Sequence, residues 1–137
     1  MKEYAFRLKH GDDIKRSIEN YCLENGINTG IILSAVGCIY HAKIRLAKAI
    51  DIMDVEDDFE VLSLNGTISF GRSHLHITLS NDKGEVLGGH LLEGSVVNTT
   101  LEVVIGALEE YRSQRCFDDS TGYNEIVFER IRNESDY

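Results

Sequence analysis

The chain has 137 residues, a length typical of one domain, and it contains three cysteines and no proline. Its 14 lysines and arginines stand against 23 aspartates and glutamates, giving a net charge of −9 at pH 7 with histidine neutral. So acidic a chain lacks the basic run with which most nucleic-acid-binding proteins neutralise phosphates. The lack of proline also excludes proline-rich linkers, so we expect a single domain over residues 1–137.

The cysteines and the apolar segments indicate where the protein resides. Cys22, Cys38 and Cys116 form no CxxC pair, which argues against a thiolate zinc site and against a disulfide framework. Reduced thiols are typical of a cytoplasmic protein. The longest apolar run, Ile31–Tyr40, is interrupted by serine and glycine and is too short to span a bilayer. We therefore expect a cytoplasmic protein that does not bind membranes.

The N-terminal third predicts a strand, a helix and a second strand. Apolar and polar residues alternate over residues 4–9, as in a half-buried strand. The turn at residues 10–13 contains two aspartates placed to cap a helix. Apolar residues then follow helical spacing from Ile14 to Cys22, and Asn25-Gly26 predicts the helix end. A buried strand, bent at Gly37, is expected over residues 31–40.

The remainder predicts a series of short strands. Residues 42–50 fit a half-exposed strand, with a helix as the alternative. Asn65-Gly66 is the strongest hairpin signal and predicts a turn between a strand that begins at Phe59 and a return strand that begins at Ile68. Further strands are expected over residues 75–79, 86–92, 96–108 and 123–129, with a turn at 81–84 and a frayed tail at 131–137. One helix among many antiparallel strands predicts an α+β fold with a mainly antiparallel sheet.

The histidines carry the clearest chemical signal. His74 and His76 lie two residues apart in a predicted strand, so their side chains point to the same face. A three-residue loop ending at Gly84, followed by a return strand, places His90 directly opposite His76 on that face. A two-residue loop would instead send His90 to the opposite face. The loop sequence favours the converging register, and Gly88-Gly89 leaves room beside His90 for another chain or a ligand.

Three converging imidazoles are suitable ligands for zinc or another divalent transition metal. Three protein ligands leave a fourth position open, as in catalytic zinc sites. The competing interpretation is that His74 and His76 are exposed strand residues and that His90 is a hydrogen-bonded core residue. His10 and His41 lie in turn-like surroundings and are expected to be ordinary surface residues.

Other catalytic signals are weak. Glu93 and Glu60 are the nearest candidates for a general base, although Glu93 should face away from His90 in a regular strand. No nucleophile elbow or phosphate-binding glycine motif is present in the sequence. Cys38 lies near His41 in sequence, which alone does not make a catalytic pair. Catalytic residues therefore remain unassigned, and the sequence does not establish whether the protein is an enzyme.

Six segments, in order, resemble the plants-and-prokaryotes conserved (PPC) domain. The two most specific are Ser-His-Leu-His-Ile-Thr-Leu-Ser at residues 73–80 and the segment ending in Gly-Gly-His-Leu-Leu-Glu-Gly at residues 82–94. The others cover residues 7–14, 34–39, 59–66 and 99–105. The resemblance implies an α+β fold assembled as a homotrimer, and it implies that His74, His76 and His90 can hold a metal such as zinc.

The resemblance also bears on DNA. In plants this domain follows AT-hook motifs in nuclear DNA-binding proteins, but the present chain contains no Arg-Gly-Arg-Pro sequence. A stand-alone prokaryotic member is therefore the expected class. We consider two functions: a homotrimeric metal-binding module with room for a small-molecule ligand at its open position, and a DNA-associated or regulatory interaction domain without catalysis. The second would depend on basic residues such as Lys43, Arg45 and Lys48 gathering around the trimer axis.

Overall fold

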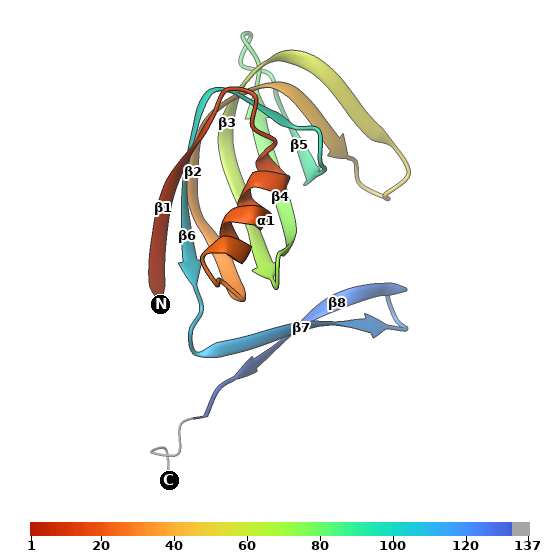
Figure 1. Ribbon diagram of the computed structural model, residues 1–137. Helices are drawn as coiled ribbons and strands as arrows, with labels where there is room; N and C mark the ends of the chain where they lie inside the picture. The colour runs from red at the N-terminus through yellow and green to blue at the C-terminus, as the bar shows by residue number, and fades with distance from the viewer. Residues whose placement is uncertain (133–137) are drawn as a thin grey trace.

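The computed structural model describes residues 1–132, which form a six-stranded antiparallel sheet, one helix and a two-stranded hairpin (Figure 1). The strand order of the sheet is β1-β6-β2-β3-β4-β5, with an additional pairing between β2 and β5. The sheet strands are β1 (Lys2–Lys9), β2 (Thr29–Arg45), β3 (Ile52–Ser69), β4 (Arg72–Ser80), β5 (Val86–Leu91) and β6 (Val96–Ala107). β7 (Tyr111–Asp118) and β8 (Tyr123–Arg130) form the hairpin, which extends away from the sheet. The predicted α+β class is confirmed.

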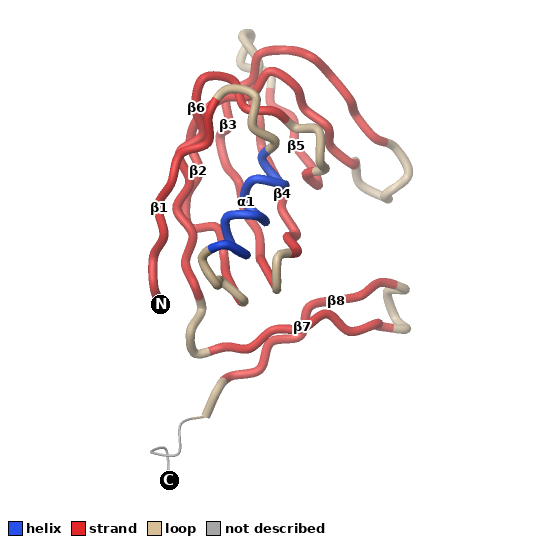
Figure 2. The backbone as a smooth tube through the Cα atoms, viewed as in Figure 1, coloured by secondary structure: helices blue, strands red, loops and turns tan. Residues whose placement is uncertain are grey.

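The helix α1 (Ile14–Glu24) lies over one face of the sheet (Figure 2), and its predicted limits are confirmed. Its N-cap is Asp13, whose Oδ1 accepts the backbone N–H of Arg16 at 3.0 Å. The other carboxylate oxygen of Asp13 accepts the backbone N–H of Gly94 at 2.6 Å. One side chain therefore caps the helix and ties it to the loop that follows β5. The buried face consists of Ile14, Ile18 and Cys22.

Substitution Asp13→Ala should lower the free energy of unfolding by about 1–2 kcal/mol, because it removes the N-cap and the bond to Gly94 together. Urea denaturation followed by circular dichroism measures the loss. Asp119→Ala is the control, since Asp119 is exposed in the β7–β8 turn and its removal should change stability by less than about 0.5 kcal/mol. Equal losses in the two variants would contradict a capping role.

The two strands predicted over residues 31–40 and 42–50 are one long strand, β2, with a register shift between Ile39 and His41. The strand interpretation is correct as far as Arg45 and wrong beyond it, since residues 46–51 form a turn closed by a hydrogen bond from the N–H of Leu46 to the carbonyl of Asp51. At its end β2 also pairs with β5 through Ile44↔Leu91 and Arg45↔His90. Strands β2, β3, β4 and β5 therefore close into a ring.

The predicted hairpin turn at Asn65-Gly66 is wrong. Strand β3 continues through both residues to Ser69, and the turn lies at Phe70-Gly71. Both turn residues have positive φ, 46° and 74°, as a two-residue type I′ turn requires. Gly66 serves another purpose, because a Cβ there would lie 2.1 Å from the carbonyl oxygen of His74. The missing side chain at Gly66 therefore allows β4 to approach closely, and the chain does not reverse there.

The remaining predictions vary in outcome. The strand predicted over 75–79 is confirmed within β4, and those over 96–108 and 123–129 match β6 and β8. The strand predicted over 86–92 ends one residue earlier, and β7 was not predicted. Ile131, in the predicted tail, donates its N–H to the carbonyl of Glu110 at 2.8 Å. The rest of that prediction, residues 133–137, lies outside the described residues.

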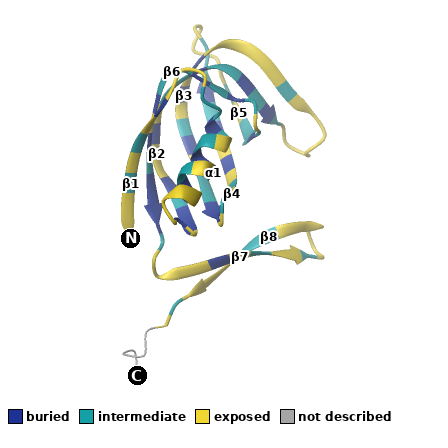
Figure 3. Ribbon diagram, in the orientation of Figure 1, coloured by how far each residue is buried: buried dark blue, intermediate teal, exposed yellow. Residues whose placement is uncertain are grey.

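The core lies between α1 and the sheet and continues inside the ring of strands (Figure 3). Leu75, Ile77 and Leu79 of β4 are buried, as the alternating pattern predicts. A buried hydroxyl chain connects the hairpin to this core, because the Oγ of Ser113 lies 2.8 Å from Thr29 Oγ1 and 2.8 Å from Ser69 Oγ. Among the described residues, no helix has the length and apolar character needed to cross a membrane.

Candidate metal centre

The three predicted histidines converge on the outer face of the strand ring. His76 on β4 is paired directly with His90 on β5, as the loop sequence predicts. The ring centroids are 5.0 Å apart for His74 and His76, 5.2 Å for His74 and His90, and 5.7 Å for His76 and His90. One ligand nitrogen from each ring lies within 4.8 Å of the other two. The side chains thus form a nearly equilateral triangle.

The triangle has the size that a tetrahedral metal requires. An ion about 2.0 Å from each ring nitrogen, with tetrahedral angles, places imidazole centroids roughly 5.2 Å apart. The observed separations of 5.0–5.7 Å bracket that value. The donor set of three imidazoles suits zinc and other divalent transition metals. The residues present therefore fit such an ion.

The ring of His90 also has an unmet bonding requirement. Its Nδ1 is buried and has no hydrogen-bond partner among the described residues. Buried polar atoms are nearly always hydrogen-bonded, so an unpaired nitrogen at this position requires an explanation. The interpretation of His90 as a hydrogen-bonded core residue does not explain this nitrogen, because the hydrogen bond is missing. A role as a metal ligand does explain it, because a bond to the metal would replace the hydrogen bond.

The local electrostatics favour neutral imidazoles. Burial, followed by the positive charge of Arg45, lowers the pKa of His90 to about 4. Burial, followed by the neighbouring His76, also lowers the pKa of His74. Neutral rings keep their lone pairs free for a metal at physiological pH, because no proton must first be displaced.

The metal-free protein should become less stable as the pH falls from about 6.5 toward 4. An unfolded histidine takes up a proton near its ordinary pKa of 6.5, whereas folded His90 does so only near 4. The unfolded chain therefore binds more protons in this window, and acidification favours it. Urea denaturation in a chelator at several pH values measures the slope, which should be shallower in a His90→Asn variant. An unchanged slope in that variant would contradict the attribution of this pH dependence to His90.

The two glycines before His90 allow β5 to fit between its neighbours. A Cβ at Gly88 would lie 2.4 Å from the carbonyl oxygen of Ile77 on β4. A Cβ at Gly89 would lie 2.6 Å from Ile44 Cγ2 and 2.9 Å from the Arg45 carbonyl oxygen, both on β2. The space predicted beside His90 is therefore taken by strands of the same chain. This close packing brings His90 to the other two rings.

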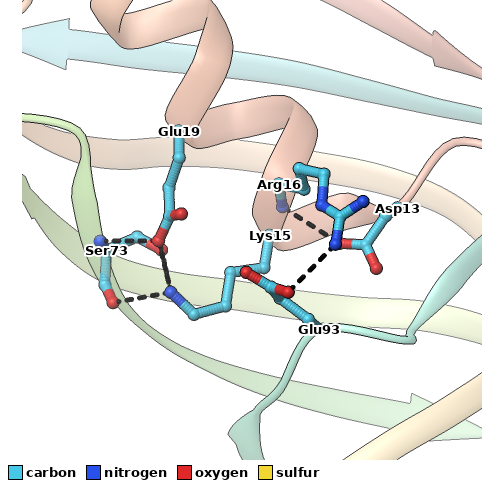
Figure 4. Close-up of polar contacts among 6 residues, drawn as sticks. All are labelled: Asp13, Lys15, Arg16, Glu19, Ser73 and Glu93. Atoms are coloured by element: carbon cyan, nitrogen blue, oxygen red, sulfur yellow. Dashed lines mark hydrogen bonds and ion pairs between the residues drawn. The ribbon is translucent and has the colours of Figure 1, made fainter.

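A polar network holds the residue that precedes His74 (Figure 4). Glu19 of α1 accepts hydrogen bonds from the backbone N–H of Ser73 at 3.0 Å and from its hydroxyl at 2.7 Å. Lys15 pairs with Glu19 and donates to the Ser73 hydroxyl oxygen at 3.0 Å. Burial alone would raise the pKa of Glu19, but the hydrogen bonds from Lys15 and Ser73 outweigh it and lower that pKa. The network fixes the start of β4 against the helix and so limits the movement of His74.

The other predicted candidates lie apart from the triad or have other partners. Glu93 forms an ion pair with Arg16 at 3.2 Å, as Figure 4 shows. Glu60 is paired with Cys38 and Ser80 in the sheet, away from the histidine cluster. His41 contacts Asp54 rather than Cys38, whose thiol donates to the carbonyl oxygen of Asn98.

Three basic residues near the site, Lys15, Arg16 and Arg45, are paired with carboxylates or partly buried. Lys15 is held by Glu19 and Arg16 by Glu93. Arg45, from the predicted basic group of Lys43, Arg45 and Lys48, is half-buried and paired with His90 in the register of β2 and β5. Sequence reasoning grouped Arg45 with Lys43 and Lys48 and missed its place beside the triad. The pairing of β2 with β5, which determines that place, leaves no local sequence signal.

Comparison with known proteins identifies relatives of this chain. The chain is 34% identical over 131 residues to the bifunctional protein GlmU of a Synechococcus strain. That alignment covers 96% of this chain but only 21% of the relative, so the chain spans about a fifth of that protein's length.

Solved structures match over nearly the whole chain. A hypothetical protein from Salmonella cholerae-suis is 32% identical with a TM-score of 0.90, covering 94% of each chain. A metal-containing protein from Archaeoglobus fulgidus is 31% identical with a TM-score of 0.77, covering 93% of this chain and 94% of the other. A candidate DNA-binding protein from Bacteroides thetaiotaomicron is 25% identical with a TM-score of 0.79, covering 95% and 93%. The model of the Plants and Prokaryotes Conserved (PCC) domain matches residues 1–109, and the chain belongs to this family.

Proposed function

We propose that the protein is a metal-binding module in which His74, His76 and His90 hold one divalent transition metal ion, with zinc as the expected ion. The observation that carries the proposal is the triangle of imidazole rings, whose centroids are 5.0–5.7 Å apart. The unpaired Nδ1 of His90 supports it independently. The similarity to a metal-containing protein of Archaeoglobus fulgidus agrees with it.

The donor set leaves a fourth position for water or a ligand, as in zinc sites that bind substrates. Zinc at such a position polarises a carbonyl or phosphoryl oxygen and lowers the pKa of a bound water. A hydrolytic reaction would also need a general base, and the two sequence candidates do not supply one, since Glu93 is paired with Arg16 and Glu60 lies elsewhere in the sheet. The proposal is therefore metal and ligand binding, without an assigned reaction.

Titration of the metal-free protein with Co²⁺ tests this proposal. Wild-type protein should bind about one equivalent per chain and develop the visible absorption of tetrahedral cobalt. His76→Ala should lose this absorption, whereas His41→Ala should retain it because His41 pairs with Asp54 outside the cluster. Absence of the tetrahedral bands in wild-type protein, or their persistence in His76→Ala, would overturn the proposal.

We also infer that the chain assembles as a homotrimer, and the hairpin supports self-association. Among the described residues, the outer edges of β7 and β8 pair with no other strand, and an isolated two-stranded hairpin is marginally stable. Phe117 and Tyr123 on this hairpin are 65% and 60% exposed. A groove of about 800 Å³ between the hairpin and the sheet adds a surface that a second copy could fill.

Light scattering tests the assembly. Wild-type protein should give three times the chain mass of 15.4 kDa. Phe117→Asp should shift the mass toward the single chain, whereas Val86→Asp, which changes a similarly exposed residue on β5, should not. A wild-type mass of one chain would overturn the inference.

The alternative function is a DNA-associated or regulatory interaction domain. The similarity to a candidate DNA-binding protein of Bacteroides thetaiotaomicron favours it, whereas the net charge of −9 opposes it. Binding through phosphates would weaken steeply with salt. A titration against duplex DNA at two salt concentrations distinguishes the functions: salt-dependent binding at physiological ionic strength supports the alternative, and no binding removes it.

A further inference from the structure

Among residues 1–132, the Arg45 side chain beside the histidine cluster has no hydrogen-bond or ion-pair partner. The side chain is half-buried, and no hydrogen bond or ion pair to its guanidinium occurs within residues 1–132. Most buried or half-buried guanidinium groups are paired with a carboxylate, because leaving the charge unpaired carries a desolvation penalty. An arginine placed this way is expected to have a partner outside the described residues.

The strand register determines which way Arg45 points. Residues paired across antiparallel strands have side chains on the same face of the sheet. Arg45 is paired with His90, and His90 is paired with His76. The three side chains therefore form a row across β2, β5 and β4 on one face. The neighbouring pair Ile44↔Leu91 is fully buried on the opposite face, which confirms this alternation.

The charges around the triad agree with this placement. After burial, the positive charge of Arg45 is the strongest influence that lowers the pKa of His90. Arg45 and Arg115 both act in the same direction on the pKa of His74, and Glu125 opposes them. The positive charge of Lys15 also lowers the pKa of His90, but Lys15 is paired with Glu19.

Within residues 1–132, the candidate ligand set of this site consists of three histidines and includes no carboxylate. A divalent ion held by neutral imidazoles keeps its full charge, and Arg45 adds another positive charge beside it. Such a site is complementary to an anion. A guanidinium is especially suited to carboxylate and phosphate oxygens, which it binds through two parallel N–H groups.

We propose that the open position beside His74, His76 and His90 binds the oxyanion group of a small molecule, a carboxylate or a phosphate, and that Arg45 anchors this group. The inference rests on the proposed metal site, since the anion is bound by the metal and Arg45 together.

Cobalt-loaded protein provides a test that does not depend on activity. Inorganic phosphate and acetate are titrated separately while the visible absorption of the bound Co²⁺ is recorded. At least one anion should change the spectrum of the wild-type protein in a saturable manner, and the anion that binds more tightly identifies the oxyanion class. Arg45→Gln should retain the cobalt stoichiometry and weaken anion binding at least about tenfold, because a charge-assisted hydrogen bond is lost. Arg45→Lys should recover part of the affinity.

Arg112→Gln is the matched control, since Arg112 is exposed on β7, and it should behave as the wild type. If cobalt binds but neither anion changes the spectrum, or if Arg45→Gln binds anion as tightly as the wild type, the inference is wrong while the metal site stands. If cobalt does not bind at all, the proposed metal site is wrong and the inference falls with it.

Discussion

Zinc added to the metal-free protein at about a hundredfold excess over its dissociation constant should raise the melting temperature by roughly 10 °C. A ligand that binds only the folded state stabilises it by about 2.7 kcal/mol at that excess. The three rings that would bind zinc belong to β4 and β5, which are adjacent only in the folded chain. Unfolding separates the ligands, so zinc should act on the folded state.

Two variants separate this effect from unspecific zinc binding. In His76→Ala the shift should nearly disappear, because two imidazoles hold zinc much more weakly than three. His41→Ala should show the full shift, since His41 contacts Asp54 away from the triad. Differential scanning calorimetry with zinc and with chelator measures both. An equal shift in His76→Ala and wild type would place the zinc elsewhere.

Substitution Gly66→Ala should destabilise the protein by about 1–3 kcal/mol or more and should weaken metal binding at least about tenfold. The added Cβ would lie 2.1 Å from the carbonyl oxygen of His74 and 2.6 Å from Leu75 Cδ2. A backbone oxygen cannot rotate aside, so β4 must move away from β3 at the position of His74. Urea denaturation and the cobalt titration measure the two effects.

Gly122→Ala is the control for this substitution. Gly122 lies in the β7–β8 turn with φ of 78°, and a Cβ there meets no atom within 4 Å. It should lose only the roughly 1 kcal/mol of a left-handed non-glycine residue and should bind cobalt as the wild type does. Normal cobalt affinity in Gly66→Ala would show that the position of His74 does not depend on this contact.

The candidate site was largely predictable because it rests on local rules. Alternation along β4 determines the face of His74 and His76, and the loop ending at Gly84 determines the register of His90. Gly84 has φ of 74°, the left-handed conformation that a three-residue loop needs at that position. Each of these features involves residues close together in the sequence.

The errors arose where distant strands decide the conformation. A glycine after asparagine is typical of a hairpin, but Gly66 is required by the close approach of β4 at His74. Arg45 resembled a solvent-exposed cation because nothing near it in the sequence reveals its pairing with His90, 45 residues away by the register. The strand β7 was missed since its pattern is mixed and its stability depends on contacts such as that of Ser113 with Thr29.

The central claim is that His74, His76 and His90 form a metal site, and elemental analysis of protein purified without a histidine tag or chelator tests it most directly. We expect close to one zinc or other divalent transition metal ion per chain, and near zero in His76→Ala purified in the same way. Negligible metal in the wild-type protein, even after reconstitution with zinc and dialysis, would contradict it.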